Sequence, residues 1–239
     1  NAQWREANAE TGDVMQKIMG KEEEGCLTED DCINFPHEEL KIIGTLNENM
    51  LTISFVEIEW QGQCLSIEHQ IIEPKHTKNN DYIVFLHEGL GSVSMWKDFP
   101  TQLCNALGMR GLVYSRPGYG QSSSLSKSAN WDAQFMHLQA KEILPALLNS
   151  LDITVQHHTR LHLLGHSDGA SIAIIFASLF PELCKRIILL APHIMVEEIT
   201  IAGITQAQQA YISGQLLTAL GKHHNQAALC FESWSSIWL

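Results

Sequence analysis

The sequence lacks any uninterrupted run of eighteen apolar residues, the length that a membrane-spanning helix needs. It is also short of basic residues: 15 Lys and Arg stand against 27 Asp and Glu, for a formal net charge of −12. A nucleic-acid-binding face requires a surplus of basic side chains, so this balance argues against such a partner. No basic stretch followed by an apolar core opens the chain, which argues against a secretory signal. We therefore expect neither a membrane nor a nucleic acid as partner.

Paired cysteine motifs are absent as well. The six cysteines are widely spaced and form no C-x-x-C, which indicates reduced thiols and a cytoplasmic protein. Two pairs among the 12 histidines, at 157–158 and 223–224, are direct neighbours, and neighbouring residues do not face the same ion. The sequence thus predicts no metal site and no cofactor.

Charge and texture divide the chain near residue 50. Residues 1–49 carry 12 acidic and 4 basic side chains, and apolar residues at helical spacing predict a helix over 1–20. With 239 residues and 45% apolar content, the chain can bury a sizeable core. We assign residues 1–49 to an acidic N-terminal segment of unknown role, 50–192 to an α/β core and 193–239 to a C-terminal helical region.

Strand and helix patterns alternate after residue 50. Apolar residues at every second position predict a β-hairpin over 51–60 and 64–72, and near-continuous apolar runs predict strands at 82–86, 111–114, 160–164 and 185–190. Helical periodicity predicts helices at 94–107, 131–148, 170–179, 197–211, 214–222 and 225–237. This alternation predicts an α/β fold, with a mostly parallel sheet covered by helices on both faces.

The most informative stretch is Gly-His-Ser-Asp-Gly at 165–169, between a predicted strand and a predicted helix. Gly-x-Ser-x-Gly in this setting is typical of a nucleophile elbow, a sharp turn that presents a serine hydroxyl. The two glycines permit a close approach of strand and helix, and the N–H groups at the start of a helix suit a developing oxyanion. A glycine-flanked turn with a helix-capping serine is the alternative interpretation.

Three motifs in order make residues 51–239 resemble the α/β-hydrolase family. They are His-Glu-Gly-Leu-Gly-Ser at 87–92, Arg-Pro-Gly-Tyr-Gly-Gln-Ser at 116–122 and the Gly-x-Ser-x-Gly turn. The resemblance implies an α/β-hydrolase fold, a nucleophilic Ser167 and an incomplete helical cap over 193–239. It also implies an oxyanion hole made by the amides of Asp168 and of the 88–90 loop, where Gly89 is the first choice and Leu90 lies beside it.

Four more residues are candidates to line the substrate pocket: His87, Glu88, Trp96 and His193. Glu88 stands where the family usually has glycine, and His193 follows a predicted strand at the catalytic edge of the sheet. The resemblance implies that the acid and the histidine of the catalytic triad follow later strands, beyond Leu239. We therefore expect this stretch of chain to be inactive by itself.

The other histidines are not assigned to catalysis. His162 is expected to pack in the core, and His166 to point away from the substrate. His223 and His224 belong to the helical region and are expected to face solvent.

These features predict a serine hydrolase that acts on a small-molecule acyl substrate. It would cleave a small ester, a thioester or an activated carbon–carbon bond through an acyl-enzyme on Ser167. A non-catalytic ligand-binding module of the same fold and an acyltransferase remain open, because the same motifs serve all three. The sequence predicts no oligomeric state.

Overall fold

The computed structural model describes residues 53–124, 134–153 and 159–239. The chain divides into two units, residues 1–50 and 51–239, and the description concerns the second. The helix predicted for residues 1–20 lies outside the described residues. Within the described part of the chain, no helix is both long and apolar enough to cross a bilayer.

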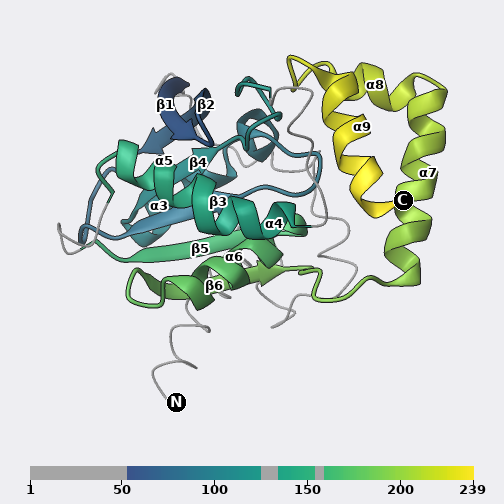
Figure 1. Cartoon of the computed structure of the whole chain (residues 1–239). Helices are drawn as coiled ribbons and strands as arrows, with labels where there is room; N and C mark the ends of the chain where they lie inside the picture. The colour runs from purple at the N-terminus through teal and green to yellow at the C-terminus, as the bar shows by residue number, and fades with distance from the viewer. Residues whose placement is uncertain (1–52, 125–133, 154–158) are drawn as a thin grey trace, which may run out of the picture. The chain divides into compact units, whose positions relative to one another are not determined.

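A six-stranded sheet forms the centre of the described residues, in the order β1-β2-β4-β3-β5-β6 (Figure 1). Its strands are β1 (Ser54–Trp60), β2 (Gln63–Ile72), β3 (Tyr82–Leu86), β4 (Arg110–Tyr114), β5 (Leu161–His166) and β6 (Cys184–Leu190). The β1–β2 hairpin and the β2–β4 pair are antiparallel, and the pairs β3–β4, β3–β5 and β5–β6 are parallel. The prediction of a mostly parallel sheet is confirmed.

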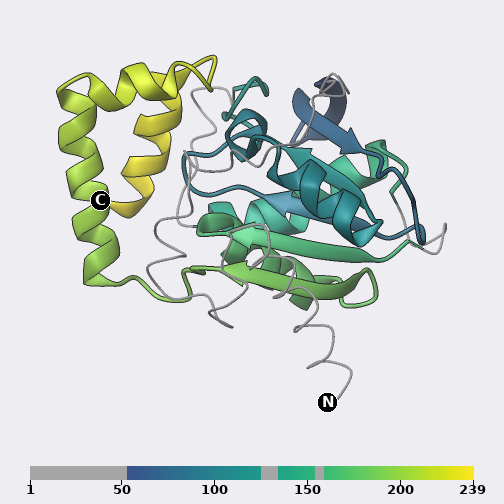
Figure 2. The same cartoon turned by 180° about the vertical axis from the view of Figure 1, so that it is seen from behind.

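Helices cover both faces of this sheet (Figures 1 and 2). They are η1 (Val93–Trp96), α3 (Phe99–Leu107), α4 (Phe135–Leu138), η2 (Gln139–Ile143), α5 (Leu144–Ser150) and α6 (Asp168–Leu179). Neighbouring strand residues point to opposite faces. Phe85 packs edge-on against Phe99 of α3, with ring centroids 6.2 Å apart. Val84 belongs instead to the buried cluster formed by α4 to α6 with the sheet.

Two predicted helices are interrupted, in each case near a proline. The helix predicted at 94–107 is a short 3₁₀ turn and then α3, because Pro100 fits only in the first turn of a helix. The helix predicted at 131–148 contains the π-helical turn η2 directly before α5, whose first turn holds Pro145. A proline ring clashes with the carbonyl four residues earlier, and a wider turn relieves that clash.

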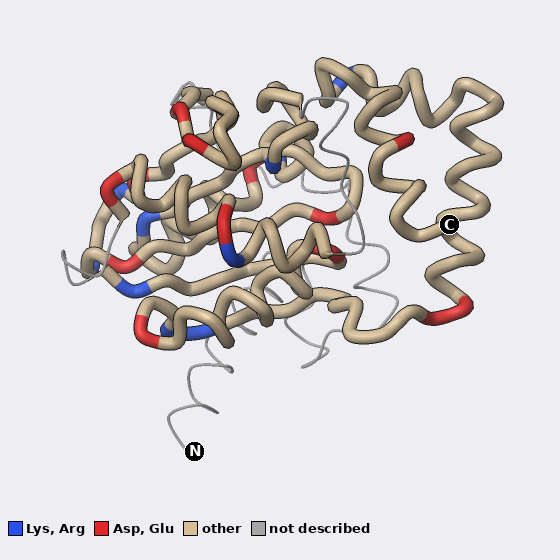
Figure 3. Tube along the Cα trace, in the orientation of Figure 1, with Lys and Arg blue, Asp and Glu red and all other residues tan. Residues whose placement is uncertain are grey.

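Three helices follow β6: α7 (Glu198–Ile212), α8 (Gln215–Leu220) and α9 (Ala227–Trp238). Leu220, Ala227 and Phe231 form their small core, and Leu90 of the 87–92 loop packs against it. Residues 198–239 hold only three charged side chains, Glu198, Lys222 and Glu232. The three helices are accordingly almost entirely tan in Figure 3. This charge-poor helical region lies within residues 193–239, for which the sequence predicts a cap.

Candidate active site

Ser167 occupies the turn between β5 and α6 with φ 52° and ψ −118°, a strained conformation for a residue other than glycine. The turn requires glycine on both sides. A Cβ on Gly165 would lie 2.6 Å from the Cα of Ala170, and one on Gly169 would lie 2.7 Å from the carbonyl oxygen of His87. The strand and the helix therefore approach each other more closely than any side chain allows, which is the geometry of a nucleophile elbow.

The imidazole of His193 is hydrogen-bonded to this serine, with 2.8 Å between Nε2 and the Oγ of Ser167. Ser171 of α6 holds the backbone of His193, since its hydroxyl donates to the His193 carbonyl and accepts the His193 N–H, both at 2.8 Å. The Trp238 ring stands edge-on to the imidazole, with centroids 5.1 Å apart. When Ser167 donates, Nε2 carries no proton. The sequence predicted only a pocket-lining His193, whereas the structure brings it within reach of the hydroxyl proton.

Asp168 places a buried carboxylate beside this pair, with only 1% of the residue exposed. Its Oδ2 accepts a hydrogen bond of 3.2 Å from the indole of Trp234, and its Oδ1 lies 4.0 Å from the Nε2 of His193. Burial raises the pKa of Asp168, and the positive charge of Arg116 opposes that rise. Trp234 also packs on Gly89, where an added Cβ would lie 2.6 Å from the indole Cε2. Helix α9 thus contacts both residues predicted to donate to an oxyanion.

The 87–92 loop is anchored through its carbonyl groups. Arg116, which is 1% exposed, donates to the carbonyls of His87 and Glu88, at 2.8 Å each. The Gly91 N–H reaches the Glu88 carbonyl as well, at 3.1 Å. The C=O and the following N–H of a trans peptide point in opposite directions, so this anchoring turns the Gly89 N–H away from Arg116. That N–H has no hydrogen-bond partner among the described residues, as an oxyanion donor requires.

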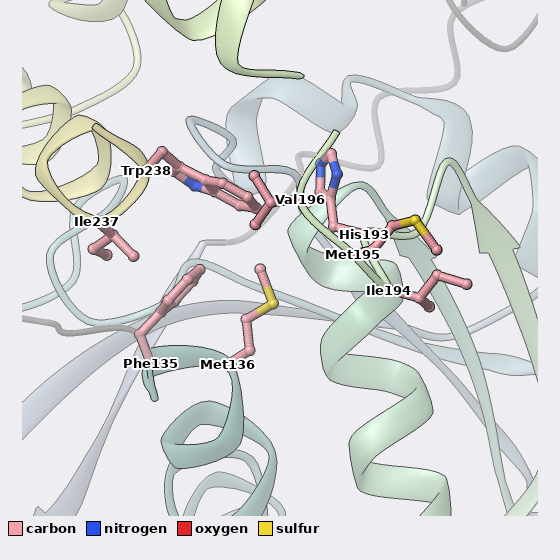
Figure 4. A pocket seen from close by; sticks show the side chains of 8 residues that line it. All are labelled: Phe135, Met136, His193, Ile194, Met195, Val196, Ile237 and Trp238. Atoms are coloured by element: carbon pink, nitrogen blue, oxygen red, sulfur yellow. The ribbon is translucent and has the colours of Figure 1, made fainter. Parts of the chain in front are cut away.

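A cavity of about 240 Å³ lies beside the imidazole of His193. Its wall is almost entirely apolar: Phe135, Met136, His193, Ile194, Met195, Val196, Ile237 and Trp238. In Figure 4, Phe135 and Met136 extend from α4 toward Ile237 and Trp238 of α9. The cavity therefore lies between α4 and α9, and its wall includes His193, the residue hydrogen-bonded to Ser167.

The other three pocket candidates do not line this cavity. His87 is 1% exposed. Its Nε2 accepts a hydrogen bond of 3.1 Å from the backbone N–H of Arg116, and its Nδ1 donates to the Glu88 carbonyl at 2.7 Å. The Glu88 carboxylate lies 3.7 Å from the Nδ1 of His166. Trp96 packs against aromatic rings of the core. Among the described residues, no three His, Cys, Asp or Glu side chains come together as a metal site requires.

The structure tests the expectations for the remaining histidines. His162 is 6% exposed, which confirms that it packs in the core, and burial lowers its pKa to about 4. The prediction that His224 faces solvent is wrong, because only 5% of it is exposed. The turn between α8 and α9 packs against the 87–92 and 116–122 loops, a long-range contact that helical periodicity does not reveal. The sequence gives no signal for a buried histidine at this turn.

Comparisons with known proteins agree with this architecture. A family model described as alpha/beta hydrolase fold matches residues 81–211. A probable hydrolytic enzyme from Pseudomonas aeruginosa superimposes with a TM-score of 0.56 at 20% identity, over 79% of this chain and 67% of that one. A thermophilic esterase from Thermogutta terrifontis gives 0.55 at 14% identity, over 78% and 71%.

A third crystal structure, from work on carboxylesterases of Nitrososphaera gargenis, has a TM-score of 0.53 at 17% identity. The superposition covers 76% of this chain and 65% of that one. The chain thus spans about two thirds of the length of these structures. At such identities the likeness concerns the fold.

Proposed function

The chain belongs to the α/β hydrolase fold family, and from this premise we propose that it is a serine hydrolase acting on small esters. The observation that carries the proposal is the 2.8 Å contact between Ser167 Oγ and His193 Nε2 at a strained strand-to-helix turn. A hydroxyl is a weak nucleophile until a base takes its proton. We propose His193 as that base, which departs from the sequence-based expectation of a base beyond Leu239 and of a chain that is inactive by itself.

In the acylation step, Ser167 Oγ attacks the ester carbonyl carbon and its proton passes to Nε2 of His193. The carbonyl oxygen becomes an oxyanion, which accepts hydrogen bonds from the amides of Asp168 and Gly89. The imidazolium is stabilised by the Asp168 carboxylate, whose Oδ1 is 4.0 Å from Nε2. When the tetrahedral intermediate collapses, the C–O bond to the alcohol breaks and His193 returns the proton to the departing oxygen.

In the deacylation step, a water molecule replaces the alcohol. His193 takes a proton from the water as its oxygen attacks the acyl carbon of the Ser167 ester. Collapse of the second tetrahedral intermediate releases the carboxylic acid and returns the proton to Ser167. The two steps need the same donors and the same base, so one arrangement of residues serves both.

The cavity supports a small apolar group on the substrate. At about 240 Å³ it is smaller than the pockets of drug-sized ligands, roughly 300–1,000 Å³. Its apolar wall suits an alkyl group rather than a charged one. The similarity to an esterase and to carboxylesterases supports an ester as the bond that is cleaved.

We further propose that the protein works in the cytoplasm, because its six widely spaced cysteines form no C-x-x-C and are typical of reduced thiols.

Hydrolysis of p-nitrophenyl acetate, butyrate and octanoate tests this proposal. We expect Ser167→Ala to abolish turnover and His193→Gln to lower kcat by about 10²–10⁴, the usual contribution of a general base. The matched control is Ser236→Ala, which removes an exposed serine hydroxyl of α9. Turnover that survives Ser167→Ala would overturn the proposal. Added alcohol that diverts the acyl group into a new ester would identify acyl transfer in place of hydrolysis.

A further inference from the structure

The turn between α8 and α9 inserts one buried side chain between two loops of the core. His224 is 5% exposed, and its Nδ1 accepts a hydrogen bond of 2.8 Å from the N–H of Gly120. Its Nε2–H donates to the carbonyl of Leu90 at 2.9 Å. The next residue, Asn225, donates its N–H to the Gly120 carbonyl at 2.9 Å. Both ring nitrogens are therefore used, and the ring is neutral with its proton on Nε2.

The Leu90 carbonyl is one of three carbonyls in the 87–92 loop that a side chain anchors, while the Ser92 carbonyl accepts the Met95 N–H at 3.1 Å. Arg116 holds those of His87 and Glu88 from the core side, and His224 holds that of Leu90 from the helical region. With these three groups fixed, the Gly89 N–H is placed from both sides. Without His224, the Leu90 carbonyl would be released, and the loop would keep its bonds to Arg116 and its far end, where the Val93 N–H donates to the Ser115 hydroxyl at 2.9 Å.

We propose that His224 is a positioning residue, which locks the helical region to the core and holds the oxyanion loop in its reactive geometry. The lock itself is a matter of packing and hydrogen bonding. Its effect on turnover rests on the proposed ester hydrolysis, in which Gly89 donates to the oxyanion.

The lock is expected to open at acid pH. Protonated Nδ1 would present an N–H to the N–H of Gly120, so a charged ring loses this acceptor and opposes docking. Burial lowers the pKa of His224, and His223 and Arg116 lower it too, whereas the Leu90 carbonyl and Glu88 raise it. The Cys230 thiol of α9, 3.8 Å from Nδ1, and the Tyr119 ring also face the imidazole. Docking is therefore strongest above the ordinary histidine pKa and weakens as the pH falls below it.

Three substitutions at this position separate the two hydrogen bonds. His224→Phe keeps a planar ring and removes both bonds. His224→Asn keeps an acceptor at the reach of Nδ1, and His224→Gln keeps a donor at the reach of Nε2. His223→Phe is the matched control, since the neighbouring imidazole is hydrogen-bonded to the exposed Ser94 hydroxyl, at 2.9 Å, and to neither of the two loops.

Two readouts are measured on the full chain: amide hydrogen exchange at Gly120 and at residues 88–91 by NMR, and kcat and KM for p-nitrophenyl butyrate from pH 5 to 8. For His224→Phe we expect exchange to rise at least tenfold at Gly120. We also expect kcat to fall 10- to 100-fold while KM changes less than threefold. The part of the acid-side decrease in kcat that comes from protonation of His224 should be absent in this variant. His224→Gln should retain more of kcat than His224→Asn, because it keeps the bond to Leu90. His223→Phe should match the wild type in exchange at Gly120 and in kcat at pH 8, where both imidazoles are neutral.

Unchanged exchange at Gly120 in His224→Phe would overturn the lock, and raised exchange with unchanged kcat would overturn its positioning role. If His224→Phe does not fold, equal kcat in His224→Gln and His224→Asn, both at the wild-type level, would overturn it equally. A wild type that hydrolyses no ester would refute the proposed function, and the exchange data alone would then decide on the lock.

Discussion

Gly169→Ala is the substitution that most directly tests how closely the elbow is packed. An added Cβ would lie 2.7 Å from the carbonyl oxygen of His87 and closer still to that of Leu86, where ordinary contact begins at 3.4 Å. Both obstacles are backbone atoms, so no side chain can rotate away. Helix α6 must move from β3 by roughly 1 Å, carrying Ser167 with it.

Overpacking of a core typically costs about 1–3 kcal/mol, and a rigid backbone obstacle belongs at the upper end of that range. Alanine gains at most about 1 kcal/mol over glycine in helix propensity, which leaves a net loss of about 2 kcal/mol. For a domain of this size, such a loss lowers Tm by about 4–8 °C. A displacement of about 1 Å at Ser167 should also slow the proposed ester hydrolysis about 100-fold.

Thermal unfolding by circular dichroism and the rate of labelling by a fluorophosphonate measure the two effects. Gly203→Ala is the matched control, because Gly203 lies exposed within α7 and nothing is within 4 Å of its added Cβ. This control should be stabilised by about 0.5–1 kcal/mol and be labelled at the wild-type rate. A Gly169→Ala protein with the same Tm and the same labelling rate as Gly203→Ala would refute the close packing of the turn.

Three further substitutions follow from the site and the core. Gly89→Ala should lower kcat because its Cβ meets the indole of Trp234, and Trp234→Leu should restore part of that loss in the double variant; additive effects in the cycle would contradict the contact. Asp168→Asn should lower kcat at least about fivefold, because it removes about 1 kcal/mol of attraction between the carboxylate and the His193 imidazolium 4.0 Å away. An unchanged kcat would show that the carboxylate does not stabilise the imidazolium. Burial lowers the pKa of His162 to about 4. Between pH 6.5 and 4 this histidine is therefore protonated in the unfolded chain and neutral in the folded chain. The wild-type free energy of unfolding should therefore fall by roughly 3 kcal/mol more than that of His162→Leu between pH 6.5 and 4, as urea titrations would measure.

The fold was predictable where burial is continuous along the chain. The strand at 82–86 has the predicted ends, because a run of apolar residues covered on both faces leaves no choice of element. The helix predicted at 131–148 was less accurate, since the pattern does not report how Pro145 widens the preceding turn. The helix predicted from residue 170 begins at Asp168, directly after the turn that the Gly-x-Ser-x-Gly motif predicts.

The candidate site was predictable only in the part that local sequence determines. Ser167 and its turn follow from five consecutive residues. The contact of His193 with Ser167 depends on Ser171, four residues beyond the serine, binding the backbone of the loop after β6. The burial of His224 depends on loops more than 100 residues earlier in the chain. Contacts of this kind are set by tertiary packing, which periodicity and motifs do not encode.

The central claim is that Ser167 is the presented nucleophile, and a covalent adduct tests it most directly. The protein would be treated with a fluorophosphonate and digested, and the modified residue located by peptide mass spectrometry. We expect one adduct, on Ser167, that forms more slowly in His193→Gln and is absent in Ser167→Ala. An unmodified Ser167, or an adduct on another residue, would contradict it.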